Sequence, residues 1–191
     1  SIRPGWFYHE SQDTLVKSPE KLFEIYLTSV GRGSNLLLNI PPDQTGQFHE
    51  NDVASLQGLR KILDSVFQTN YASTAKIMAT NFRGNDGDYA PQNVLDADFE
   101  TYWATDDDIT QASIELELSS PQKLNYLILQ EYIPLGQRIA AFKVHVWQNG
   151  VWTEVAHATT IGYKRILPLG GVESSKVKVS ITNALGCPIL S

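Results

Sequence analysis

Three carboxylates in the N-terminal loops are the side chains of this sequence best suited to acid–base chemistry. They are Glu10, Asp13 and Asp43, and two carboxyl groups held at a suitable separation can act as general acid and general base. Nothing in their spacing requires any two of them to face one substrate, and most Asp and Glu side chains in proteins are solvated. We therefore predict that all three have structural or solvated roles.

The histidines and the cysteine offer no metal or disulfide pattern. His9 and His49 have no second ligand at metal-binding spacing, so we expect neither to bind a metal ion. The single cysteine, Cys187, excludes both an intramolecular disulfide and a cysteine-based zinc site.

The charge distribution argues against two classes of partner. The net charge is −6 and the isoelectric point is about 5.1, whereas proteins that coat nucleic acid or anionic membranes need basic surfaces. The acidity is uneven, because residues 86–117 hold ten Asp or Glu and no Lys or Arg. No apolar run approaches the ~18 residues of a membrane span. We expect no nucleic-acid partner and no membrane span.

The size suits a soluble globular protein of one domain or two small ones, with 191 residues and 42% hydrophobic content. The first six residues lack an initiator Met and a signal-peptide core. We expect the chain to be part of a longer polypeptide.

The first seventy residues have the pattern of an α/β fold. Ser18, Pro19 and Glu20 favour the start of a helix, and apolar residues then recur at three- and four-residue spacing, so we predict a helix over about 19–30. A second apolar stripe predicts a helix from a cap at Asn51 or Asp52 to about Thr69.

Between the two helices, residues 35–40 form a short apolar run typical of a strand covered on both faces. Such a strand needs neighbours that this segment does not supply, which favours part of a larger parallel sheet or (β/α) barrel. Chemistry in those folds gathers at the C-terminal ends of strands, which singles out Asn39, residues 41–43 and the loop 3–13, although ordinary turn roles are equally compatible with these residues.

From about Tyr71 onward the pattern is that of β-structure. Residues 114–118 alternate strictly between apolar and acidic side chains, and 142–147 and 151–155 flank Asn149-Gly150, a strong hairpin signal. Further strands are predicted at 124–132, 163–167 and 177–181. Turn signals at about ten-residue intervals favour a β-sandwich of the jelly-roll kind.

The first part contains a series of motifs, in this order: Ser1-Ile2-Arg3-Pro4-Gly5-Trp6-Phe7-Tyr8-His9, Val16-Lys17-Ser18, Ser29-Val30-Gly31-Arg32, Asn35-Leu36-Leu37-Leu38-Asn39-Ile40-Pro41-Pro42-Asp43 and Gly46. Together they resemble the last part of the catalytic barrel of glycoside hydrolase family 29, the α-L-fucosidases. The resemblance covers about residues 1–68. The Arg-Pro-Gly-Trp form is most similar to the branch that prefers α-1,3 and α-1,4 fucosyl linkages.

Residues 93–103 of the second part have the sequence Asn-Val-Leu-Asp-Ala-Asp-Phe-Glu-Thr-Tyr-Trp. They match the Ala-Leu-Asp-Gly-Asp-x-x-Thr-x-Trp signature of the coagulation factor 5/8 type C, or discoidin, domain found in carbohydrate-binding modules, with Ala97 where glycine is usual. About residues 76–191 resemble this domain, and residues 113–118, 148–152 and 176–180 match its later strands more loosely. The resemblance implies a galactose-binding-like sandwich with one further strand beyond Ser191.

The fucosidase resemblance implies a retaining glycosidase, whose two carboxylates stand ~5 Å apart. In the family both precede the Arg-Pro-Gly-Trp segment, so we expect no catalytic residue in this chain and predict that the chain alone is inactive. The resemblance places Trp6 in the fucose pocket, where an indole can cover the sugar's methyl group and apolar face; loop packing is its alternative role. Arg3 is a second substrate-site candidate, with a structural salt bridge equally open.

The discoidin resemblance places a structural Ca²⁺ near Asp96, Asp98 and Thr101, because such modules commonly hold the ion there and Ca²⁺ takes oxygen ligands. A run of solvated acids is the equally open alternative, and Asp106-Asp107-Asp108 suits a solvated loop. No cofactor is expected for catalysis. The candidate glycan-contact residues of this part are Phe82, Arg83, Asn85, Tyr89 and Tyr163. Trp103, Trp147 and Trp152 are expected to be core residues instead.

Our leading hypothesis is therefore a C-terminal portion of a retaining α-L-fucosidase that removes terminal α-linked fucose from glycans. Its organisation would be an α/β remnant of a (β/α)8-type barrel over residues 1–70 and an all-β jelly-roll sandwich over 71–191 that lacks its last strand. Its partners would be the remainder of the polypeptide and a fucosylated oligosaccharide. A secreted, periplasmic or lumenal location is expected from the family. The alternative is a non-catalytic glycan-binding or adhesion module; a different retaining glycosidase is disfavoured by the density of the match.

Overall fold

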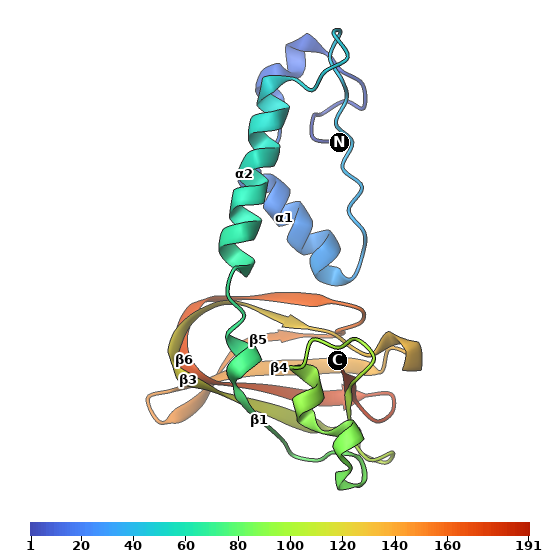
Figure 1. The fold of residues 1–191 in the computed structure, drawn as a ribbon, viewed down its shortest axis with the longest axis vertical. Coiled ribbons are helices and arrows are strands. Elements are labelled where there is room, and N and C mark those ends of the chain that lie inside the picture. The colour runs from blue at the N-terminus through green and yellow to red at the C-terminus, as the bar shows by residue number, and fades with distance from the viewer. The chain divides into compact units, whose positions relative to one another are not determined.

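The computed structural model describes all residues from Ser1 to Ser191, and the chain divides into two compact units, Ser1–Thr69 and Asn70–Ser191. The first unit is helical and the second is built on antiparallel strands (Figure 1). The expected fold class was an α/β remnant of a (β/α)8-type barrel followed by an all-β jelly-roll sandwich. It is confirmed as a helical N-terminal remnant followed by an antiparallel β-sheet domain. None of the helices has both the length and the apolar character needed to cross a membrane.

The first unit contains two α-helices, α1 (Pro19–Ser29) and α2 (Glu50–Phe67), with short 3-10 turns at Glu10–Leu15 and Val30–Arg32. The Ser18 hydroxyl caps α1 by accepting a hydrogen bond from the Lys21 amide, as its sequence predicts. The predicted start of α2 is wrong by a few residues. His49 is the N-cap, and Asp52 lies inside the first turn with its side chain fully buried.

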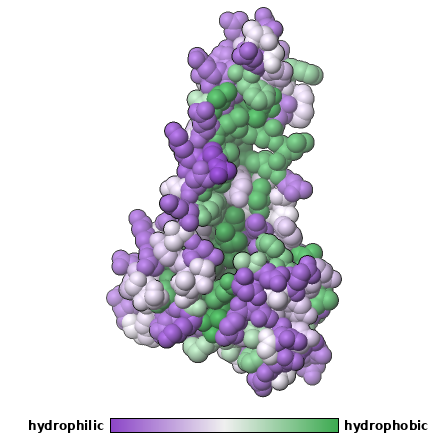
Figure 2. All heavy atoms as spheres, viewed as in Figure 1, coloured by the Kyte–Doolittle hydropathy of each residue, from purple (hydrophilic) through white to green (hydrophobic).

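The strand predicted at residues 35–40 is wrong. These residues form no ladder, and Leu37 is 89% exposed. The physical reason is that the first unit holds no neighbouring strand to accept the hydrogen bonds of this segment. One of its links to the rest of the unit is a hydrogen bond from the Ile2 amide to the Asn39 carbonyl, 2.9 Å long. Figure 2 shows hydrophobic residues gathered over much of one face of this unit.

The second unit has one five-stranded sheet in the order β1-β3-β6-β4-β5 and a two-stranded sheet, β2-β7. The strands are β1 (Lys76–Ala79), β2 (Trp103–Ala104), β3 (Ala112–Leu129), β4 (Ile139–Gln148), β5 (Val151–Ala158), β6 (Arg165–Ala184) and β7 (Ile189–Leu190). Short 3-10 turns lie at Tyr71–Thr74, Arg83–Asn85, Gly87–Tyr89, Pro91–Val94 and Ile133–Leu135. Neighbouring strands in both sheets pair antiparallel. The predicted hairpin is confirmed: Gln148 pairs with Val151 across Asn149 and Gly150, both with positive φ.

Two pairs of predicted strands are each one long strand. Residues 114–118 and 124–129 both belong to β3, whereas 165–167 and 177–181 both belong to β6. The β3–β6 ladder shifts register between Glu117 and Gln122, where Pro121 lies. Proline has no amide to donate and is tolerated at such an irregularity, so a sequence that resembles a turn is here a bulge.

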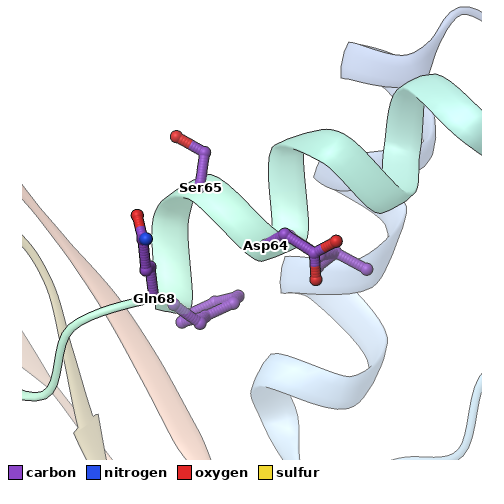
Figure 3. Close-up of a pocket in the computed structure, with 5 residues that line it drawn as sticks. Asp64, Ser65 and Gln68 are labelled. Carbon is purple, nitrogen blue, oxygen red and sulfur yellow. The ribbon is translucent and has the colours of Figure 1, made fainter.

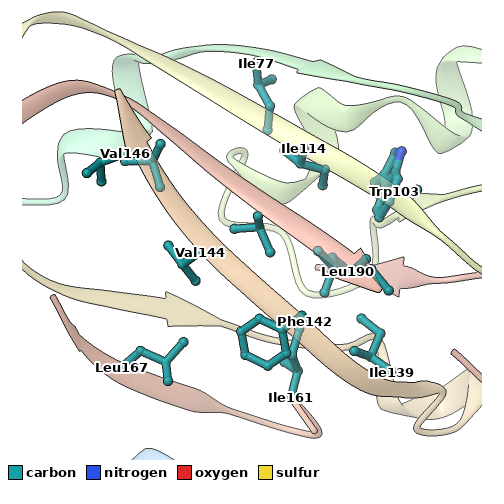
Figure 4. Close-up of a cluster of buried hydrophobic side chains, with 14 of the residues drawn as sticks. Ile77, Trp103, Ile114, Ile139, Phe142, Val144, Val146, Ile161, Leu167 and Leu190 are labelled. Carbon is teal, nitrogen blue, oxygen red and sulfur yellow. The ribbon is translucent and has the colours of Figure 1, made fainter. Parts of the chain in front are cut away.

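The core lies between the two halves of this long ladder. Ile114 and Val179 come from one half and Leu124 and Leu167 from the other, and all belong to one buried cluster with Trp103 (Figure 4). The β3–β6 ladder therefore folds over itself to form the two layers of the sandwich. Trp103 is core as predicted, but Trp147 and Trp152 lie outside both buried clusters. Trp147 alternates along β4 with the inward-facing Val144 and Val146, and Trp152 pairs with Trp147 from β5, so both lie on the other face of the sheet.

Candidate functional site

A fully buried arginine organises the loop that carries the predicted substrate residue. Arg3 has no exposed surface, and its guanidinium donates to Asp52 through Nε, 3.0 and 3.1 Å from the two carboxylate oxygens, and through Nη2 at 2.7 Å. Asp52 is also 0% exposed and lies on α2. The hydrogen bond from Arg3 to Asp52 raises the pKa of Arg3 further, so the guanidinium is permanently charged. Of the two roles left open for Arg3, the salt bridge is present; a substrate contact stays a prediction.

Asp13 gives the same guanidinium a second carboxylate. Arg3 Nη1 lies 2.6 Å from Asp13 Oδ1, and the other oxygen of Asp13 lies 3.3 Å from both the Tyr8 hydroxyl and His49 Nε2. The hydrogen bond from Arg3 is the main cause that lowers the pKa of Asp13. Asp13 therefore acts as a structural anion, which agrees with the role predicted for it.

The other two N-terminal acids form no catalytic pair with it. Asp43 Oδ1 accepts hydrogen bonds from the Thr45 amide at 2.7 Å and the Thr45 hydroxyl at 2.6 Å, and the hydroxyl contact is the main cause that lowers the pKa of Asp43. This is the geometry of an aspartate that shapes a turn. Glu10 is exposed in the first turn of a 3-10 helix.

Asn39 joins the segment 35–40 to the N-terminal loop. Its side-chain amide donates to the Trp6 carbonyl at 2.8 Å and to the Ser1 hydroxyl at 3.2 Å, and its own carbonyl accepts from the Ile2 amide. The Gly5 amide donates to Gln12 Oε1 at 3.1 Å. The backbone on both sides of Trp6 is thus held, whereas its indole is 60% exposed. The structure brings together Asn39 and the loop that the sequence pattern singled out, and leaves the Trp6 ring exposed, as is the ring of its neighbour Phe7 at 74%.

The predicted calcium loop of the second unit is closed by its own side chains. Asp96 accepts hydrogen bonds from the Asp98 amide at 2.8 Å and the Thr101 hydroxyl at 2.7 Å, and Asp98 accepts from the Glu100 amide at 2.9 Å. Ala97 has φ of +62°, so alanine adopts the left-handed turn for which glycine is usual.

A calcium ion takes six to eight oxygen ligands, and this loop offers two carboxylates and a hydroxyl. No group of three or more His, Cys, Asp or Glu anywhere in Ser1–Ser191 is arranged to hold a metal ion. The donor set of the loop is therefore incomplete by itself, and calcium binding stays a prediction.

The predicted glycan-contact residues divide into two groups. Phe82 packs against the core, and Arg83 is paired with Asp107 and lies over the Tyr89 ring with Cζ 5.5 Å from its centroid. Tyr163 is 61% exposed, and Asn85 lies in a turn with φ of +53°. Arg83 and Tyr89 thus pack against each other. Tyr163 and Asn85 are the more accessible of the predicted glycan-contact residues.

Glu131 is a structural residue that the sequence analysis missed. It is only 3% exposed and accepts hydrogen bonds from the amides of Arg138 at 2.7 Å, Ile139 at 2.8 Å and Gly162 at 2.6 Å. One carboxylate therefore satisfies three backbone donors from two loops. No local motif marks this role, because the partners are as many as 31 residues away in the sequence.

The hollow at the end of α2 is not a convincing site. It has a volume of about 450 Å³ and is lined by Leu63, Asp64, Ser65, Phe67 and Gln68. All five residues come from the C-terminal end of the helix region, and Figure 3 shows Asp64 and Ser65 pointing in different directions. It lacks the convergent polar groups of a ligand site.

The comparisons with known proteins match both units. Residues 71–188 match the family model described as F5/8 type C domain. The chain belongs to this family. Residues 1–65 match the model described as Alpha-L-fucosidase, so the F5/8 type C domain follows a segment homologous to the C-terminal region of family 29 fucosidases.

Individual relatives match both parts of this F5/8 type C chain together. Alpha-L-fucosidase 1 from Arabidopsis thaliana is 35% identical over 195 aligned residues, which cover 100% of this chain and 38% of that protein. The crystal structure of SpGH29 is 42% identical with a TM-score of 0.91, covering 99% of this chain and 41% of the other. A family 29 fucosidase from Ruminococcus gnavus in complex with fucose is 30% identical with a TM-score of 0.91, covering 100% and 38%. The chain thus spans well under half the length of these relatives.

Proposed function

We propose that this chain is the C-terminal portion of a retaining α-L-fucosidase that removes terminal α-linked fucose from glycans. The observation that carries the proposal is the loop around Trp6. Arg3, Gly5 and Asn39 hold its backbone, and the indole of Trp6 stays 60% exposed. The similarity to a fucosidase structure that contains fucose supports the same conclusion.

Trp6 would contribute binding and not proton transfer. Fucose is a deoxy sugar with a methyl group and an apolar face, and an indole can cover both while other groups form hydrogen bonds to the hydroxyls. Retention requires two carboxylates ~5 Å apart. The N-terminal acids of this chain already serve as salt-bridge and turn residues, so the two carboxylates would come from the remainder of the polypeptide.

The test compares this chain with a polypeptide in which it follows the remainder of a family 29 catalytic barrel. We expect the longer polypeptide to hydrolyse a nitrophenyl α-L-fucoside with retention of configuration, which proton NMR of the first-formed sugar measures. This chain alone should show no turnover. Turnover by the purified 191-residue chain, checked by intact mass, would place catalysis here and refute the proposal.

Substitution of Trp6 separates its binding role from loop packing. Trp6→Ala in the longer polypeptide should lower kcat/KM for fucosides, because the ring would no longer cover the sugar in the transition state. Trp6→Phe retains an aromatic face and should recover part of the loss. An unchanged kcat/KM in Trp6→Ala would refute the assignment of Trp6 to the substrate site.

Three further parts of the proposal follow from the sequence resemblance. The favoured linkages are α-1,3 and α-1,4, which a panel of α-1,2, α-1,3, α-1,4 and α-1,6 fucosylated oligosaccharides would test. The site of action is secreted, periplasmic or lumenal, which fractionation of the source cells would test. A structural calcium ion binds near Asp96, Asp98 and Thr101, with its remaining oxygen ligands from backbone carbonyls, water or residues outside this chain.

A further inference from the structure

The side-chain amide of Asn39 holds both of the backbone carbonyl groups that flank Trp6. Its Nδ2 donates to the Trp6 carbonyl at 2.8 Å and to the Ser1 hydroxyl at 3.2 Å. The Ser1 hydroxyl in turn donates to the Gly5 carbonyl at 2.7 Å. One amide therefore holds the Trp6 carbonyl directly and the Gly5 carbonyl through a single hydroxyl.

These two carbonyls belong to the two peptide planes that meet at the Cα atom of Trp6. The Gly5 carbonyl lies in the plane before Trp6, and the carbonyl of Trp6 lies in the plane after it. Because a peptide unit is planar, only φ and ψ of Trp6 separate the two planes. Holding both planes fixes φ and ψ and, with them, the direction of the Cα–Cβ bond. Only rotation of the indole about χ1 and χ2 then remains.

The hydrogen bonds of this group require an amide at position 39. A backbone carbonyl only accepts, so the Asn39 atom that faces the Trp6 carbonyl is the amide nitrogen. The Ser1 hydroxyl accepts from Asn39 and gives its own hydrogen to Gly5, so both of its functions are used. Asn39→Asp would preserve the shape of the side chain but replace the donor with a second acceptor. It would therefore place two acceptors against each other at the Trp6 carbonyl.

The backbone of Asn39 is itself anchored to a buried residue. Its carbonyl accepts from the Ile2 amide at 2.9 Å, and the Ile2 carbonyl accepts from the Lys17 amide at 3.0 Å. Ile2 has no exposed surface. The side chain that holds the backbone of Trp6 thus extends from a fixed point of the unit.

We propose that Asn39 is a positioning residue of the substrate site, which sets the direction of the Trp6 indole toward the sugar. The inference rests on the proposed function, in which this indole covers the apolar face of fucose. Because the indole is 60% exposed, neighbouring side chains restrain it little and its direction depends on the backbone. A side chain that is ordered before the ligand arrives loses less freedom on binding. The effect of Asn39 on turnover therefore passes through Trp6.

The ion pair of Arg3 with Asp52 has a different role. Both side chains are fully buried and join the loop to α2, so removal of either charge threatens the helices themselves. The Arg3 guanidinium donates to Asp52, Asp13 and the His9 carbonyl, and to neither carbonyl that flanks Trp6. Asn39 lies outside all helices and strands. Its substitution therefore reports on Trp6 more directly than substitution of Arg3 does.

The first test follows the Trp6 amide of the 191-residue chain by ¹⁵N NMR relaxation. The parent chain should show an order parameter of about 0.85, the value of rigid backbone, and Asn39→Asp should lower it below about 0.6. Ser1→Ala removes only the path to Gly5 and should give an intermediate value. The matched control is Asn35→Asp, the same change at an exposed asparagine of the same segment, and it should leave the order parameter unchanged.

The second test measures kcat/KM for a nitrophenyl α-L-fucoside in the longer polypeptide. Asn39→Asp should lower kcat/KM about tenfold, and Asn35→Asp should leave it unchanged. In a Trp6→Ala background, Asn39→Asp should cause less than about a twofold further change, because the ring that it positions is absent. A residue that supported the fold in general, or that contacted the sugar itself, would cost about tenfold in both backgrounds.

Three results would overturn the proposal: an unchanged order parameter in both Asn39→Asp and Ser1→Ala, an unchanged kcat/KM in Asn39→Asp, or a further loss of about tenfold in the Trp6→Ala background. If Asn39→Asp unfolds the helices, Ser1→Ala decides by both measurements, because it leaves the contact with the Trp6 carbonyl in place. Failure of the parent longer polypeptide to hydrolyse fucosides would instead refute the proposed function. The order parameters are measured without turnover, so the two failures are distinguishable.

Discussion

Removal of Asp52 should destabilise the helices of the first unit far more than removal of an exposed aspartate from the same helix. Arg3 and Asp52 are both 0% exposed and are joined by three contacts of 2.7–3.1 Å. Breaking a buried ion pair on one side costs about 3–5 kcal/mol, because a charge is left buried without its partner. Asp13 keeps its contact with the guanidinium at 2.6 Å, so we expect the lower end of that range, about 3 kcal/mol, for Asp52→Ala.

The matched control is Asp64→Ala on the same helix α2. Asp64 pairs with Arg60 at 2.8 Å, but the two side chains are 56% and 77% exposed. Pairs of this kind, four residues apart on a helix surface, contribute about 0.3–0.5 kcal/mol. The two aspartates thus differ in burial while sharing residue type, partner type and helix.

Urea unfolding followed by helical ellipticity measures both variants, with the indole NMR signal of Trp103 as the separate signal of the second unit. With a slope of about 1 kcal/mol per molar urea for a unit this small, Asp52→Ala should lower the helical midpoint by about 3 M or unfold the helices in water. The Trp103 signal should not move. If Asp52→Ala costs no more than Asp64→Ala, the buried pair does not hold this unit together. The double variant Arg3→Met with Asp52→Leu should recover most of the loss, because it removes both buried charges.

Three further predictions concern other contacts. Asp13 has a lowered pKa in the folded chain, so its charged form stabilises the fold. This stabilisation is present above the ordinary aspartate pKa of about 3.9 and is lost as pH falls through the lower pKa of the folded chain. In thermal melts at pH 2–7, the melting temperature of Asp13→Asn should therefore fall less steeply with acid than that of the parent chain. Gly58→Ala should lower the melting temperature of the helices, because the new Cβ would lie 2.9 Å from Pro19 Cβ, whereas Ser65→Ala at an exposed site of α2 should not. Calcium should raise the melting temperature of the second unit in the parent chain and not in Asp98→Asn, and no rise in the parent would count against the ion.

The elements predicted well are those whose signals are local. Ser18, Pro19 and Glu20 determine the start of α1 by contacts within one turn, and the structure has that helix and that cap. Asn149 and Gly150 adopt the positive φ of a two-residue hairpin and join β4 to β5 as expected. In both cases the favourable conformation depends on residues adjacent in the sequence.

The errors arise where the same local signal has two physical outcomes. The Ser-Ser-Pro-Gln stretch at 119–122 has the composition of a turn, yet β3 continues through it with a bulge. Gly170 and Gly171, with φ of +71° and +72°, lie inside β6 for the same reason. Only the pairing of one long strand with another distinguishes a bulge from a turn, and that pairing is not local.

The sequence could predict which residues lie in the candidate site, but not what each of them does there. Arg3 and Trp6 were both substrate-site candidates, and they lie three residues apart in the sequence. The partner that gives Arg3 its structural role is Asp52, 49 residues away on α2, where the sequence predicted a cap at Asn51 or Asp52. A buried ion pair between residues this far apart has no local signal in the sequence, and a substrate contact by Arg3 stays a prediction.

The same geometry explains how one short loop can contain both a buried charge and an exposed indole. Arg3 ties the loop to α2 through its ion pair with Asp52, and the Asn39 side-chain amide holds the Trp6 carbonyl. The backbone therefore has little freedom to move so that the indole becomes buried. An indole that is 60% exposed on a fixed backbone loses little conformational entropy when it meets an apolar ligand face. Loosening either contact should therefore weaken ligand binding by Trp6 without removing the ring itself. This consequence distinguishes a binding residue held in place from an aromatic side chain that is merely exposed.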